Sequence, residues 1–312
     1  MIEKTMVLEV ADLSQLYGLK DENLYTLQRW FAKLKLVFRG DLVKVSGDEE
    51  EVKRFEEKIQ QVFLHMHKYN RLSTDDLSAI LNGTASQLTE EREKGILLYS
   101  TTGKPVKART KNQKALVDAA ESNDMMFAIG PAGTGKTYTA IALAVKALKE
   151  HQVKRIILSR PAVEAGETLG FLPGDLREKL DPYLQPLYDA LMDMIPSRKL
   201  EQMIEDKVIQ IAPLGFMRGR TLSNAFVILD EAQNATYSQM KMFLTRMGEF
   251  SKFIITGDAT QIDLPDKRQS GLLKAAEILR DIEGISFIYF DADDVIRHKL
   301  VTSIIRAYEN EN

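Results

Sequence analysis

A glycine-rich stretch in the middle of the chain has the residue types and spacing that hold a triphosphate. It matches G-x-x-x-x-G-K-[ST] in full, follows the apolar run Met125–Ile129 and precedes a helix predicted over Tyr138–Lys149. The glycines let backbone N–H groups turn toward a phosphate, where a side chain would block the approach. Lys136 supplies a mobile positive charge to the β- and γ-phosphates, and Thr137 offers its hydroxyl to Mg²⁺. The alternative, a chance match in a glycine-rich turn, does not explain the strand before it and the helix after it. We expect the nucleotide-binding residues to include Gly130, Pro131, Ala132, Gly133, Thr134, Gly135, Lys136, Thr137 and Tyr138.

Two neighbouring carboxylates, Asp230 and Glu231, follow the apolar run Phe226–Leu229. In a parallel sheet, the carboxyl end of such a strand lies beside the phosphate loop. We therefore expect Asp230 to hold Mg²⁺ together with Thr137, and Glu231 to polarise the attacking water as general base. The alternative is an acidic helix N-terminus, which the helix dipole favours by charge alone. The phosphate loop favours the metal and base interpretation.

A polar run, Gly257–Ile262, follows the next apolar strand, Phe253–Thr256. An amide placed here can hydrogen-bond the γ-phosphate or the attacking water, and it loses that partner after hydrolysis. Gln261 is our candidate for this catalytic role, and Asp258 is the expected link to neighbouring elements. A polar turn without a role in chemistry is the alternative.

Continuously apolar strands alternate with helical segments from Thr110 onward, which indicates a parallel sheet covered on both faces. The predicted fold class is α/β, with a RecA-like P-loop NTPase sheet and a small N-terminal α/β (KH-like) domain. The predicted strands are Met125–Ile129, Ile156–Leu158, Val208–Ile211, Phe226–Leu229, Phe253–Ile255 and Ile285–Phe290.

The first 70 residues read as a separate small α/β unit. A strand at Met6–Val10 is followed by a helix at Asp21–Leu34, by two short strands and by a second helix with an acidic first turn. This order resembles a reduced KH-type RNA-binding module, but we expect no GXXG loop between helices. Docking or oligomerisation and direct RNA binding are both open. The expected domains are residues 1–70, a helical connector with a β-hairpin turning at Gly103 (71–109), and the ATPase domain (110–312).

Composition excludes several classes of protein. The chain has 312 residues, with 44% hydrophobic and 28% charged residues, so a disordered or fibrous protein is excluded. Its 42 basic and 45 acidic residues give a net charge of −3, so any nucleic-acid contact must come from a local patch. The absence of cysteine excludes a disulfide framework. We expect a soluble, cytoplasmic protein with no membrane partner, because the first residues lack a signal-peptide layout and no apolar window is long enough to span a membrane.

Several motifs together resemble the PhoH-like family, which is related to superfamily 1 helicases. The resemblance covers roughly Lys111 to Tyr308 and, more loosely, the N-terminal unit. It implies ATP hydrolysis with Mg²⁺ on a single RecA-like domain, ring-shaped hexamers and a link to RNA metabolism. The matching segments, besides the phosphate loop, are Leu229–Asn234, Thr256–Asp263, Ser159–Val163, Gly170–Asp175 and Arg297–Val301.

Two further site residues come from this resemblance. Gln113 stands where a helicase glutamine reads the adenine edge, which would favour ATP over GTP; a surface glutamine at a helix start is the alternative. Arg297 matches the family's Arg-His pair and is our first candidate for the arginine finger, which contributes several powers of ten in rate. Arg218 and Arg220 are the other candidates.

A helicase cleft uses two RecA-like lobes, and this chain encodes one. The finger would then come from a neighbouring subunit, which points to a closed homo-oligomeric ring. For single-stranded RNA, the expected contacts are Arg160 with the loop to Glu167 and the basic residues Lys104, Lys107, Arg109 and Lys111. A solvated hairpin that carries basic residues without binding RNA is the alternative.

Two functions from different classes follow. The first is a hexameric ATPase that translocates on, remodels or unwinds single-stranded RNA. The second is an ATP-dependent switch or scaffold that binds a protein partner, such as a YbeY-type endoribonuclease, without motor activity.

Overall fold

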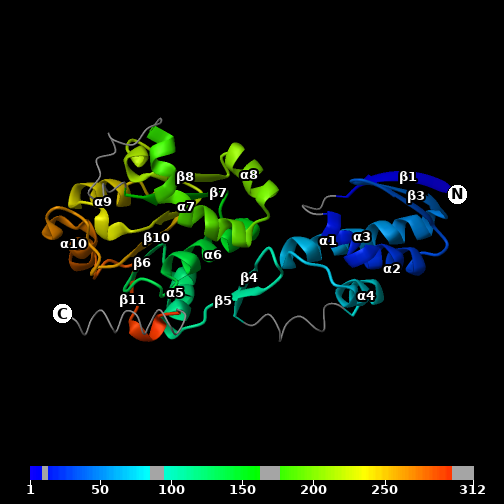
Figure 1. The fold of residues 1–312 in the computed structure, drawn as a ribbon, viewed down its shortest axis with the longest axis horizontal. Helices are drawn as coiled ribbons and strands as arrows, with labels where there is room; N and C mark the ends of the chain where they lie inside the picture. The colour runs from blue at the N-terminus through cyan, green and yellow to red at the C-terminus, as the bar shows by residue number, and fades with distance from the viewer. Residues whose placement is uncertain (9–12, 85–94, 162–175, 297–312) are drawn as a thin grey trace. The chain divides into compact units, whose positions relative to one another are not determined.

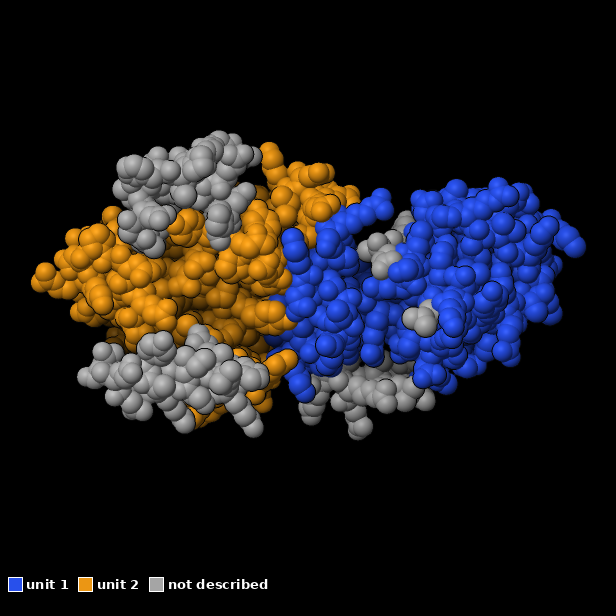
Figure 2. Space-filling model, in the orientation of Figure 1, with its two compact units in different colours: residues 1–107, 192–199 blue, residues 108–191, 200–312 orange. Residues whose placement is uncertain are grey.

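The computed structural model describes residues 1–8, 13–84, 95–161 and 176–296 (Figure 1). The chain divides into two compact units, one formed by residues 1–107 and 192–199 and the other by residues 108–191 and 200–312 (Figure 2). The expected α/β class is confirmed, since a parallel sheet with helices makes up the larger unit and a small antiparallel sheet lies in the other. No helix in the described ranges is long and apolar enough to cross a bilayer.

The N-terminal unit has a three-stranded antiparallel sheet in the order β1-β3-β2. The long helix α3 begins after the Asp48 cap and packs Val52, Phe55 and Ile59 into the core. Helix α4 adds Leu77 and Ile80 to the same core, so this core extends beyond residue 70. The elements are β1 (Ile2–Val7), α1 (Leu13–Tyr17), α2 (Glu22–Trp30), β2 (Lys35–Arg39), β3 (Leu42–Gly47), α3 (Glu49–Tyr69), α4 (Thr74–Asn82), β4 (Ile96–Tyr99) and β5 (Pro105–Lys107).

The region between β1 and β2 differs from the prediction. Strand β1 begins at Ile2 rather than Met6, helix α2 ends at Trp30, and a short helix α1 precedes it. A short connection, Gly18–Asp21, which contains a 3-10 turn at Leu19–Asp21, therefore lies between two helices, and as expected it is not a GXXG sequence. Gly18 (φ 77°), Lys20 (φ 54°) and Asp21 (φ 63°) are left-handed, and Asp21 has the position of the second glycine of GXXG. The periodicity missed α1 because the helix has only five residues, of which only Leu16 is buried.

The β4–β5 hairpin is confirmed, with its turn at Gly103 (φ 74°). Glycine is favoured in this turn because its left-handed φ would strain a residue with a side chain, and a Cβ there would also lie 2.7 Å from Arg71 Cδ.

The larger unit is built on a six-stranded parallel sheet in the order β11-β6-β10-β9-β7-β8. Every residue of β6 and β9 is buried, as the continuously apolar runs predict. Helices α9 and α10 pack against the sheet through Phe243 and Leu272, α5 contacts β6 and β11, and α6 contacts β7, β9 and β10. The elements are α5 (Lys111–Ser122), β6 (Met125–Ile129), α6 (Lys136–Lys149), β7 (Arg155–Arg160), α7 (Leu176–Met194), α8 (Ser197–Glu205), β8 (Ile209–Pro213), β9 (Ala225–Leu229), α9 (Tyr237–Leu244), β10 (Lys252–Gly257), α10 (Gly271–Ile278) and β11 (Ile285–Tyr289).

Candidate functional site

Four neighbouring strands of the parallel sheet bring the predicted motifs to one edge. Strand β10 lies between β6, which leads into the phosphate loop, and β9, which leads into Asp230 and Glu231. Strand β7 lies on the other side of β9 and ends at Arg160. Because the strands are parallel, their carboxyl ends meet, and this edge is where open α/β sheets bind ligands.

The phosphate loop is held open by glycine geometry. Gly133 (φ 82°) and Gly135 (φ 76°) adopt left-handed conformations, and Gly130 has φ 156°. A Cβ at Gly130 would collide with the carbonyl of Phe290, and one at Gly135 would lie 2.7 Å from Gln113 Nε2. The backbone is thus left accessible for an anion at the N-terminus of α6.

Lys136 is buried inside this loop. Its ammonium donates to the carbonyls of Gly130 (2.6 Å) and Pro131 (2.6 Å) and to Thr134 Oγ1 (3.2 Å). These three contacts hold the ammonium at the centre of the loop.

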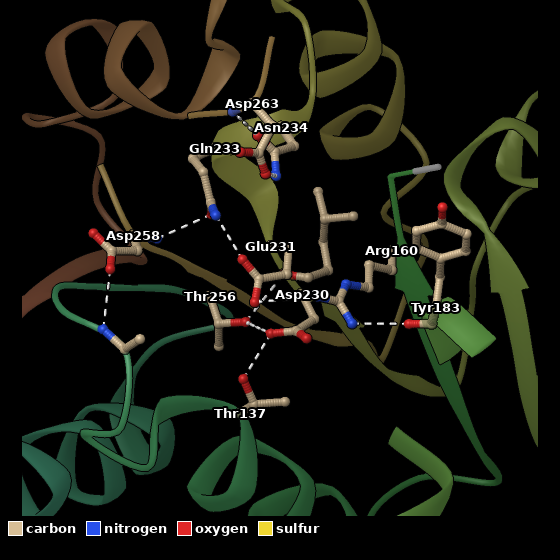
Figure 3. Close-up of polar contacts among 12 residues, drawn as sticks. Thr137, Arg160, Tyr183, Asp230, Glu231, Gln233, Asn234, Thr256, Asp258 and Asp263 are labelled. Carbon is tan, nitrogen blue, oxygen red and sulfur yellow. Dashed lines mark hydrogen bonds and ion pairs between the residues drawn. The ribbon is translucent and has the colours of Figure 1, made fainter. Parts of the chain in front are cut away.

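Thr137 and Asp230 meet, as the two motifs predict. Thr137 Oγ1 donates to Asp230 Oδ1 at 2.6 Å, and Thr256 Oγ1 of β10 donates to the same oxygen at 2.7 Å (Figure 3). Asp230 is 4% exposed. A hydroxyl beside a buried carboxylate is a ligand set that suits Mg²⁺, so the residues present fit this ion.

Both carboxylate oxygens of Glu231 are engaged. Oε1 pairs with Arg160 Nη2 at 3.3 Å, and Oε2 accepts from Gln233 Nε2 at 2.5 Å (Figure 3). Arg160 also donates to the carbonyl of Tyr183 at 2.8 Å. The side chain that we expected to contact RNA thus points to the candidate base.

Amides after the acidic pair connect it to the polar run after β10. Gln233 Oε1 accepts from the backbone N–H of Asp258 (3.0 Å), and Asn234 bonds Asp263 through both ends of its amide (3.1 and 2.8 Å). Asp258 provides the expected link, because its Oδ2 accepts from the backbone N–H of Ala132 in the phosphate loop (3.0 Å). The predicted sensor Gln261 is exposed, and its backbone N–H donates to the carbonyl of Asp258 (3.1 Å).

Gln113 is buried rather than on the surface. Its Nε2 donates to the carbonyl of Thr134 (2.9 Å), and its Oε1 accepts from the backbone N–H of Arg109 (2.8 Å). In this conformation the Gln113 amide stabilises the phosphate loop. To hydrogen-bond an adenine, the amide would have to give up these two hydrogen bonds.

The segment after β11 also contacts the phosphate loop, since the backbone N–H of Ile296 donates to the carbonyl of Gly133 (3.0 Å). Asp294 fixes this segment to the start of α5 through Asn112 (2.7 Å). Burial raises the pKa of Asp294, but hydrogen bonds from Thr110, Asn112 and the backbone outweigh it, so the pKa lies below its usual value.

The arginine candidates have different surroundings. Arg297 lies outside the described residues. Arg218 is exposed, whereas Arg220 donates to Gln210 Oε1 at 2.6 Å. The expected RNA-contact residues Lys104, Lys107, Arg109 and Lys111 are all exposed.

The fold, the glycine loop after β6 and the Thr137–Asp230 pair define a P-loop nucleotide-binding protein. Comparison with known sequences is more specific. The family model described as PhoH-like protein matches residues 105–309, and the chain belongs to this family.

Individual relatives agree with this assignment. A PhoH-like protein of Bacillus subtilis is 48% identical over 300 residues, covering 95% of this chain and 94% of that protein. One from Synechocystis is 48% identical over 278 residues, covering 88% of this chain and 85% of that protein. Protein PhoH of Escherichia coli is 43% identical over 216 residues, which are 69% of this chain and 61% of that protein.

Proposed function

We propose that this protein hydrolyses ATP in a Mg²⁺-dependent reaction and couples hydrolysis to single-stranded RNA. The main support for hydrolysis is the 2.6 Å hydrogen bond from Thr137 Oγ1 to Asp230 Oδ1, with Glu231 next to Asp230 in the chain. These groups lie at the same sheet edge as the phosphate loop, so a metal ligand set and a base are present together.

Each residue has a chemical role in this reaction. Backbone N–H groups of the loop and the Lys136 ammonium bind the phosphates, and Thr137 and Asp230 hold the metal. When bound, Mg²⁺ neutralises charge on the β- and γ-phosphate oxygens. Glu231 orients a water molecule and accepts its proton.

Steady-state hydrolysis with and without single-stranded RNA tests this function, with Glu231→Gln as the blank. We expect RNA to increase the turnover of the wild-type protein clearly and Glu231→Gln to show no turnover. Equal turnover with and without RNA contradicts the coupling and favours the alternative, an ATP-dependent switch that binds a protein partner. Absence of turnover in every condition contradicts the enzyme.

The N-terminal unit supports RNA as the partner. Its element order β1-α1-α2-β2-β3-α3 and the Gly18–Asp21 loop between α1 and α2 resemble a KH module, which clamps the nucleic-acid backbone with that loop. The exposed ammonium of Lys20 is then a phosphate contact.

Lys20→Gln is therefore expected to weaken RNA binding a few-fold, independently of base sequence. The slope of log affinity against log salt should fall by about 0.7, the value for one phosphate contact on a single strand. Binding is measured by fluorescence anisotropy across a salt series. Lys53→Gln, on an exposed position of α3, is the matched control. If the slope were unchanged in Lys20→Gln, Gly18–Asp21 would not be part of the RNA-binding site.

We also propose a closed ring in which the finger, Arg297, acts on the neighbouring subunit's nucleotide. Glu231→Gln and Arg297→Ala rings are each expected to be silent. Mixed rings should regain activity, because an intact Glu231 of one subunit then meets an intact Arg297 of the next. A mixture that stays silent, although mass spectrometry shows exchanged subunits, contradicts a finger in trans.

A further inference from the structure

A buried glutamine that no motif-based role covers joins the ends of two strands. Gln233 is 1% exposed. Its Nε2 donates to Glu231 Oε2 at 2.5 Å, and its Oε1 accepts from the backbone N–H of Asp258 at 3.0 Å (Figure 3). One amide therefore uses its donor on Glu231, the second residue after β9, and its acceptor on Asp258, the residue directly after β10.

The connection continues into the phosphate loop. Asp258 Oδ2 accepts from the backbone N–H of Ala132 at 3.0 Å, and its Oδ1 accepts from Thr260. Loop N–H groups are the ones that a bound phosphate contacts. The polar path Ala132–Asp258–Gln233–Glu231 thus runs from the phosphate site to the candidate base.

The surroundings leave Gln233 little freedom. Ser270 Oγ donates to its backbone carbonyl at 2.8 Å, and a Cβ at Gly257 would lie 2.9 Å from its Oε1. Glu231 itself has a left-handed backbone (φ 51°), which is unfavourable for a residue with a side chain and persists only where the surroundings fix it. Because the Gln233 amide is itself held in place, its hydrogen bond limits the orientations that the Glu231 carboxylate can adopt.

We propose that Gln233 is a positioning residue for hydrolysis: its Nε2 holds the Glu231 carboxylate in the orientation that accepts a proton from water, and its Oε1 ties that orientation to Asp258 and the phosphate loop. This inference rests on the proposed function, in which Glu231 is the base. Gln233 touches neither nucleotide nor water in this role.

Two variants separate the two hydrogen bonds. Gln233→Met has a similar length and removes both, whereas Gln233→Glu keeps an acceptor for Asp258 and loses the donor toward Glu231. Both are expected to lower kcat about 10- to 100-fold, because a misplacement of about 1 Å at a reacting group costs about that much. KM and the affinity for a non-hydrolysable ATP analogue should stay within about two-fold, since binding does not use Glu231.

The dependence of the Gln233 effect on Glu231 distinguishes a positioning role from a merely structural one. The double variant with Glu231→Gln should be no slower than Glu231→Gln alone, because the amide acts only through this carboxylate. Gln269→Glu, on an exposed position, is the control. Thermal unfolding checks that each variant folds; if Gln233→Glu does not, Gln233→Met gives the result.

The outcomes distinguish this inference from the function on which it rests. The positioning role is overturned if Gln233→Met keeps the wild-type kcat, or if it loses kcat and nucleotide affinity together. If Glu231→Gln has no turnover in the same experiments, the proposed function still holds. A fully active Glu231→Gln overturns both the base assignment and this inference.

Discussion

Replacement of Glu231 by glutamine is expected to reduce ATP turnover by about 10²- to 10⁴-fold, the usual contribution of a general base. The amide has nearly the same shape as the carboxylate, but it has no oxygen basic enough to take a proton from water. It also exchanges one acceptor for a donor, so it loses either the Arg160 contact or the Gln233 contact. Nucleotide binding should remain, because the phosphate contacts come from the loop.

Single-turnover hydrolysis and the binding of a fluorescent ATP analogue measure the two quantities separately. Glu283→Gln, which changes an exposed carboxylate outside the site, is the matched control and should behave as wild type. If Glu231→Gln kept more than about a tenth of wild-type turnover, another group would have to be the base.

The sheet and the central site residues could be predicted because each depends on local sequence. A strand buried on both faces is an apolar run, and β6 and β9 have the predicted boundaries to within one residue. Asp230 lies directly after β9, and Thr137 lies in the first turn of α6, after the phosphate loop that follows β6, so parallel strands bring the two residues to the same edge of the sheet. The prediction was less accurate for the edge strand β8, which lies at Ile209–Pro213 rather than Val208–Ile211, because its partly exposed residues give a weaker apolar pattern.

The connections between motifs could not be predicted, because they depend on side-chain direction rather than on spacing. Gln233 follows the acidic pair in the sequence, yet its partner Asp258 is 25 residues away. The available signal was a pair of amides, Gln233 and Asn234, that follows the two carboxylates after Ala232, and only the contacts with Asp258 and Asp263 show what these amides do. Arg160 shows the same limit: its position at a strand end fits RNA or the base equally, and only its contacts with Glu231 and Tyr183 distinguish them.

Lys136→Met should reduce nucleotide affinity by about 10- to 100-fold, which corresponds to the loss of one hydrogen-bonded charge of roughly 1.5–3 kcal/mol. Lysine has three donors, and Gly130, Pro131 and Thr134 provide three acceptors for them inside the loop. Methionine fills the same volume without a donor, so the loop carbonyls lose their partners and the phosphates lose their counter-charge.

Isothermal titration with ATP measures this affinity, and Lys154→Met, at an exposed position before β7, is the control for removal of one positive charge. The comparison with Glu231→Gln is informative: one variant should lose binding and the other only turnover. If Lys136→Met bound ATP as tightly as wild type, the ammonium would stabilise the loop through its carbonyls rather than bind the phosphates. In that case the backbone N–H groups and the dipole of α6 would have to supply the entire binding energy.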